Sequence, residues 1–116
     1  MNNYYELLQQ IQKKPGLYIG SPSISSLYMF LNGHQFARRQ LHVALSVEEE
    51  EFRGFQPWLQ EKLGVKSTQS WSQLILFRSV DERDAFNRFF ALLQEFRHCK
   101  HNLVNLNHTK ELLEPA

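Results

Sequence analysis

The sequence lacks the features that identify disulfide-bonded, membrane-spanning and exported proteins. One cysteine among 116 residues rules out a disulfide within the chain, and a lone thiol is typical of a reducing compartment. No apolar run approaches the roughly 20 residues that span a bilayer, and the opening residues, MNNYYELLQQ, lack the basic and apolar regions of an export signal. We therefore expect a soluble, cytoplasmic protein without a membrane partner.

Neither sign of charge dominates the chain. Thirteen Lys and Arg against twelve Asp and Glu give a net charge of +1, so no strong overall field attracts nucleic acid. The hydrophobic content of 42% indicates a folded protein rather than a disordered one. Since no linker or repeat divides the sequence, we expect a single domain over residues 1–116.

Apolar residues recur at helical spacing along most of the chain, which predicts an all-α fold. The expected helices are residues 3–13, residues 22–40, a stretch from Ser46 to Gly64, a stretch after Ser70, a stretch after Ser79 that includes residues 85–96, and a short helix over 109–113. The run from Leu74 to Phe77 leaves a buried strand open as an alternative. Together these segments predict a compact bundle of five or six helices.

Several helix ends carry recognisable signals. Pro15 and Gly16 are expected to stop the first helix, and residues 17–19 to form a buried extended connector. Ser21 followed by Pro22 is expected to begin the second helix. Three capping boxes are predicted, in which a serine and a residue three positions later bind each other's backbone N–H groups: Ser46 with Glu49, Ser70 with Gln73, and Ser79 with Glu82.

The stretch KKPGLYIGS at residues 13–21 resembles a string that precedes the catalytic helix in the gyrase B family of ATPases. That resemblance implies a magnesium-binding asparagine, for which Asn32 is the candidate. However, no acidic residue lies between Ile24 and His42 to act as the catalytic glutamate, and the five glycines form no D-x-G-x-G motif. We therefore interpret the stretch as a joint between helices.

No other motif indicates chemistry. His98, Cys99, His101 and His108 are soft ligands, but their spacing does not place them on one helix face and favours a structural or surface role over a zinc site. The prominent serines are expected to act as helix caps, and no G-x-S-x-G elbow occurs. We expect no metal, no cofactor and no enzymatic activity, with an unrecognised small enzyme as the third hypothesis.

A small basic group lies near the middle of the chain. Arg38 and Arg39, with His34 and His42, could contact phosphate, and Tyr28 or Phe36 could stack on a base. Two adjacent arginines are more typical of a solvated helix face, and a DNA-binding helix would carry a stronger basic excess. We therefore expect no nucleic-acid partner.

Acidic residues gather at two expected helix starts. They are Glu48, Glu49, Glu50 and Glu51 at the first, and Asp81, Glu82 and Asp84 at the second. Acids at a helix N-terminus complement the helix dipole without any partner. Four neighbouring carboxylates exceed that need, so the alternative is a negative patch that contacts a cationic partner.

Three motifs resemble a set of small bacterial proteins: the P-x-x-Y-I/L-G-S connector at residues 15–21, the F-x-x-W-L segment at 55–59, and the segment from Ser70 to Phe96. Some of these proteins are similar to immunity proteins of polymorphic or contact-dependent toxin systems. The resemblance implies a protein that neutralises a cognate toxin, such as a nuclease with a cationic cleft, by binding it. The alternative hypothesis is a non-catalytic helical interaction module or a homo-oligomeric subunit, which leaves a homodimer open.

Overall fold

A computed structural model describes the backbone of residues 3–113 and the side chains of residues 3–100, and all of its secondary structure is helical. The helices are α1 Tyr4–Lys13, α2 Pro15–Tyr18, α3 Ile24–Gln40, α4 Val47–Phe52, α5 Phe55–Leu63, α6 Trp71–Phe77 and α7 Glu82–Leu113. This confirms the predicted all-α bundle, with the four-residue α2 as an additional turn. Residues 74–77 belong to α6, so the strand alternative is wrong.

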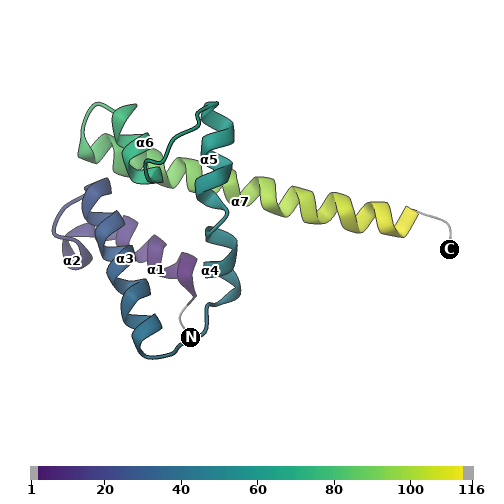
Figure 1. Ribbon diagram of the computed structural model, residues 1–116, viewed down its shortest axis with the longest axis horizontal. Helices are drawn as coiled ribbons and strands as arrows, with labels where there is room; N and C mark the ends of the chain where they lie inside the picture. The colour runs from purple at the N-terminus through teal and green to yellow at the C-terminus, as the bar shows by residue number, and fades with distance from the viewer. Residues whose placement is uncertain (1–2, 114–116) are drawn as a thin grey trace.

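Helix α7 is the central packing element. Its N-terminal half passes behind α5 and α6, and its C-terminal half extends beyond the other helices (Figure 1). Within the bundle, α7 packs against α3, α5 and α6. Its buried residues are Ala85, Phe86, Phe89, Phe90, Leu93 and Phe96, as their helical spacing predicted.

Aromatic rings fill the space between α7 and the helices that cover it. Phe55 and Phe89 have no exposed surface, and the rings of Trp71 and Phe89 stack with centroids 4.7 Å apart. Phe55 also meets Phe96 edge to face, with centroids 5.5 Å apart. Each such pair adds about 0.5–1.5 kcal/mol beyond the hydrophobic effect, so α5, α6 and α7 are held by specific ring contacts.

The joint between α1 and α3 differs from the prediction. Pro15 begins the helical turn α2 because its fixed φ angle suits a first helical position, so the extended connector is wrong. Leu17 is exposed, although it was expected to be buried. Helix α3 is capped by Ser23, whose Oγ accepts a hydrogen bond from the Ser26 N–H, and not by Ser21.

The stretch between Ser46 and Gly64 forms two helices instead of one. Pro57 explains the break, because a proline at this position in a continuous helix would clash with the carbonyl of Arg53 four residues earlier. The chain therefore restarts at Phe55, where Pro57 falls in the first turn. Gly64 ends α5 in the left-handed conformation, with φ of 66°, as predicted.

The start and end of α7 also differ from expectation. Asp81 caps this helix by accepting a hydrogen bond from the Asp84 N–H at 2.8 Å, whereas the Ser79 hydroxyl donates to the Ile75 carbonyl of α6. The capping box of Ser79 and Glu82 is therefore wrong. The short helix expected over residues 109–113 is the last part of α7.

Candidate functional site

The acidic residues at the start of α4 mostly serve the fold. Glu49 is only 8% exposed, and its Oε1 accepts hydrogen bonds from the Ser46 N–H at 3.0 Å and from Arg38 at 2.8 Å. Its contact with Ser46 completes the predicted capping box. Burial acts to raise the pKa of Glu49, but the hydrogen bonds from Ser46 and the Arg38 guanidinium outweigh it and hold that pKa below its ordinary value.

Two further glutamates of this group bind α1. Glu48 accepts a hydrogen bond from the Tyr5 N–H at 2.8 Å, and Glu51 accepts one from the Tyr5 hydroxyl at 2.7 Å. Together they join the first turn of α1 to α4. Glu50 is exposed and lies 3.9 Å from Arg53, so it is the residue of this group that stays open to solvent.

The acidic residues at the start of α7 are also engaged. Glu82 accepts three hydrogen bonds from Ser23 and Ser25 at 2.7–2.9 Å, which tie the N-terminus of α3 to α7. Burial acts to raise the pKa of Glu82, but these hydrogen bonds lower it overall. Asp84 pairs with Arg88 at 2.9 Å, and Asp81 caps the helix.

The two acidic groups do not form one patch. Glu82 binds Ser25 near the beginning of α3, whereas Glu49 binds Arg38 near its end. Thirteen residues of helix separate these contacts, which corresponds to about 20 Å at 1.5 Å per residue. The two acidic groups therefore stabilise two separate helix starts. Their role in partner binding remains a prediction.

Arginines, by contrast, gather around Glu49. A hollow of about 340 Å³ lies between the end of α3 and α4, and we call it the arginine groove. It is lined by Gln35, Arg38, Arg39, Val43, Leu45, Glu49 and Arg53. Three arginines and one glutamate thus line the same depression, which gives its lining a net positive charge.

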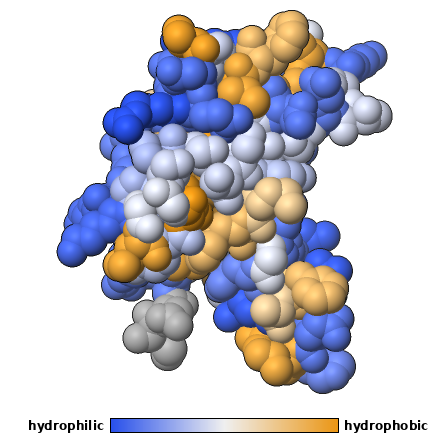
Figure 2. Space-filling model, turned by 90° about the vertical axis from the view of Figure 1, so that its left-hand side faces the viewer, coloured by the Kyte–Doolittle hydropathy of each residue, from blue (hydrophilic) through white to orange (hydrophobic). Residues whose placement is uncertain are grey.

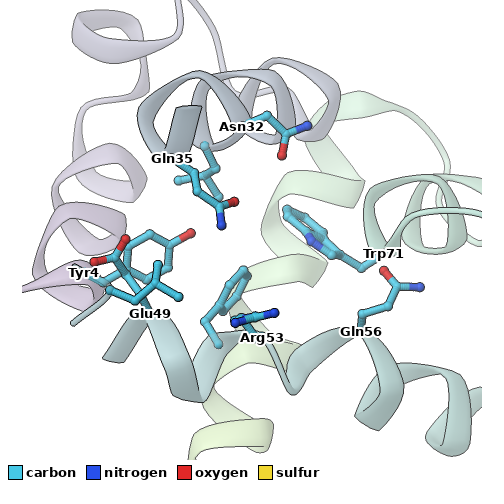
Figure 3. A pocket seen from close by; sticks show the side chains of 10 residues that line it. Tyr4, Asn32, Gln35, Glu49, Arg53, Gln56 and Trp71 are labelled. Atoms are coloured by element: carbon cyan, nitrogen blue, oxygen red, sulfur yellow. The ribbon is translucent and has the colours of Figure 1, made fainter. Parts of the chain in front are cut away.

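A second hollow of about 280 Å³ continues from the arginine groove and shares Gln35, Leu45, Glu49 and Arg53 with it. Figure 3 shows the Tyr4 hydroxyl and the Gln35 amide pointing into this hollow. Phe52 and Trp71 provide aromatic lining. Burial, together with the nearby Glu49 carboxylate, raises the pKa of Tyr4, so its hydroxyl remains protonated and can donate a hydrogen bond.

His34 lies close to the Arg38–Glu49 pair. Burial lowers the pKa of His34, the Arg38 guanidinium lowers it further, and Glu49 opposes this only in part. His34 is therefore neutral at physiological pH. Its Nδ1 is buried without a hydrogen-bond partner among the described residues.

Exposed apolar side chains surround this region. We call residues 36–47, from the last turns of α3 to the first residue of α4, the α3–α4 corner. Its exposed apolar residues are Phe36, Leu41, Val43 and Val47. In the view of Figure 2, orange apolar groups occur between blue polar ones on the lower lobe, the end at which α3 terminates in Figure 1. A second exposed pair consists of Phe77, the last residue of α6, and Val80, which lies between α6 and α7.

The cysteine and histidines near the end of the chain can be described only in part. Cys99 is exposed, while the side chains of His101 and His108 lie outside the described residues. Among the side chains that the structure describes, no three His, Cys, Asp or Glu residues gather into a metal-binding group. No helix in the described part of the chain is both long and apolar enough to cross a membrane.

Comparison with known proteins gives no relative for this chain. No family model matches the sequence, no curated protein is significantly similar to it, and no solved structure matches its fold significantly. Hypotheses about its function therefore depend on the geometry described above and on the short motifs of the sequence.

Sequence reasoning missed the α3–α4 corner. A signal was present, because LHVAL at residues 41–45 places three large apolar residues beside two arginines, outside any expected helix. Large apolar residues in a connecting segment either reach the core or remain exposed, and here most of them remain exposed. The sequence pattern alone does not distinguish these outcomes.

Proposed function

We propose that this chain neutralises a toxin by binding it, as the immunity proteins that its motifs resemble do. One observation carries the proposal: four large apolar side chains remain exposed within the α3–α4 corner, next to a hollow. Leu41 is 74% exposed and Val47 is 86% exposed. Clusters of this kind, bordered by polar residues, are typical of surfaces that bind proteins.

The proposed contact surface differs from the one expected from the sequence. Glu48, Glu49 and Glu51 make hydrogen bonds within the protein, and Glu82 is bound by two serines. Carboxylates that already have partners offer little to a cationic protein. We therefore place the toxin on the α3–α4 corner, with Glu50 as an exposed acid at its edge.

The test is co-expression of the chain with the protein encoded by the adjacent gene, followed by tagged co-purification and a growth assay. Leu41→Asp and Val47→Asp are the test variants. Both side chains are exposed, so an aspartate at either position should leave the protein folded. Each is expected to weaken the complex by roughly tenfold or more, because it places a charge in an apolar contact.

Phe77→Asp is the matched control, since Phe77 is 85% exposed but is the last residue of α6, outside the α3–α4 corner. It should leave binding and growth protection unchanged. Absence of a complex, or equal loss with all three variants, would reject the proposal. If wild-type chains instead form a dimer that Leu41→Asp dissociates in sedimentation experiments, the homo-oligomeric module is the correct alternative.

A further inference from the structure

The arginine groove has more positive charge than its single carboxylate can balance. Glu49 is the acid in its lining, against Arg38, Arg39 and Arg53. The Glu49 carboxylate is already bound by Arg38 and by the Ser46 N–H. Arg39 and Arg53 therefore have no carboxylate partner among the residues that line the groove, which makes it complementary to an anion.

The hydrogen-bonding state of these arginines supports the same conclusion. Arg39 makes no ion pair with any described residue, and the contact of Arg53 with Glu50 is long, at 3.9 Å between two exposed side chains. Exposed pairs of this kind contribute little energy, so Arg53 is free to exchange partners. The Nε of Arg38 is buried and has no hydrogen-bond partner among the described residues, although Nη2 binds Glu49 and the Ala44 carbonyl.

The apolar residues indicate which kind of anion fits. Val43 and Leu45 line the groove itself, and Leu41 and Val47 are exposed close by in sequence. Inorganic phosphate or a nucleic-acid backbone would gain nothing from these aliphatic side chains. An acidic protein segment presents carboxylates and apolar side chains together, and arginine binds carboxylates through two parallel hydrogen bonds.

We propose that the arginine groove binds an acidic segment of the partner protein, with carboxylates on Arg39 and Arg53 and apolar side chains over Val43 and Leu45. This inference rests on the proposed function, since it names the chemistry of the partner at the same corner. It also reverses the expected sign of the interaction: the partner contributes the negative charge, and the chain contributes the positive charge.

The test uses the full chain and NMR signals of the arginine side-chain N–H groups. The probes are the acidic peptide acetyl-Glu-Leu-Glu-Phe-Glu-amide, inorganic phosphate and an oligothymidylate. The peptide is expected to shift the signals of Arg39 and Arg53, with an affinity that falls as salt is raised. Arg39→Gln and Arg53→Gln should each weaken peptide binding by about tenfold, the loss expected for one charged hydrogen-bonded contact.

Arg83→Gln is the matched control, because Arg83 is also exposed but lies at the start of α7, next to Glu82, which binds the beginning of α3. It should leave peptide binding unchanged. Equal or tighter binding of phosphate or of the oligothymidylate at the same arginines would overturn the proposal in favour of a phosphate site. No shift with any probe would also overturn it.

The two proposals fail in different ways. If the adjacent gene product binds the chain but Arg39→Gln and Arg53→Gln have no effect on that complex, the arginine groove is wrong and the binding function stands. If the acidic peptide binds at the groove but no complex with the adjacent gene product forms, the groove stands and the toxin-neutralising function is wrong.

Discussion

The aromatic core around α7 and the α3–α4 corner use large apolar residues in opposite ways. In the core, Phe55, Phe89 and Phe96 have no exposed surface, and the Phe55 ring contacts the rings of both others. At the corner, Phe36 and Leu41 are exposed and lie close in sequence to Arg38 and Arg39. Because burial of such side chains is worth about 1.5–3 kcal/mol each, the buried residues supply stability, whereas the exposed apolar residues of the corner contribute little to it.

This difference separates residues that hold the fold from residues available for recognition. Substitutions in the core should change the free energy of unfolding, and substitutions at the corner should change binding alone. A corner residue that strongly affected stability would contradict this division. The Arg38–Glu49 pair lies between the two regions, since it lines the arginine groove and also anchors α4 to α3.

The largest expected effect is in the core. Phe89→Ala should lower the free energy of unfolding by about 3–5 kcal/mol, because it removes a fully buried ring and leaves a cavity between α5, α6 and α7. Urea denaturation followed by circular dichroism measures this loss. The control, Phe36→Ala at the corner, should change stability by no more than about 0.5 kcal/mol. Similar losses for both variants would show that the corner is part of the core.

Glu49→Ala should have the next largest effect. The substitution removes the N3 member of a capping box and leaves the Arg38 guanidinium without its carboxylate, which should cost about 2 kcal/mol in unfolding free energy. Glu50→Ala is the matched control, since Glu50 is exposed and lies 3.9 Å from Arg53. If the two variants are equally stable in urea, the buried pair contributes nothing and the corner is not anchored through it.

The fold was largely predictable from the sequence because its determinants are local. Helical spacing identified the buried face of α7, and Ser46 and Ser70 marked the starts of α4 and α6. The errors were at junctions, where more than one residue offers a plausible cap or stop. Ser79 and Asp81 are both reasonable caps by residue type, but Asp81 is the cap that the structure has. The Glu82 carboxylate accepts hydrogen bonds from serines of α3 instead.

The candidate site was much less predictable, because it depends on contacts between distant segments. The run from Glu48 to Glu51 reads as free negative charge in sequence, yet Tyr5 from α1 and Arg38 from α3 bind three of its members. Arg53 joins Arg38 and Arg39 only after the chain turns at the α3–α4 corner. No local sequence pattern shows which acidic side chain pairs with which basic side chain in the folded protein.

The smallest effect concerns pH and tests the junction between the two regions. Because burial and the Arg38 charge lower the pKa of His34 in the folded state, the unfolded chain binds its proton more readily. Stability should therefore fall as pH drops below about 6.5, the ordinary pKa of histidine. Urea midpoints between pH 7.5 and 5.5 should show a smaller fall for His34→Gln than for wild type. His42→Asn, at an exposed histidine with φ of 57°, is the control and should keep the wild-type slope. An unchanged slope for His34→Gln would show that folding does not lower the pKa of His34.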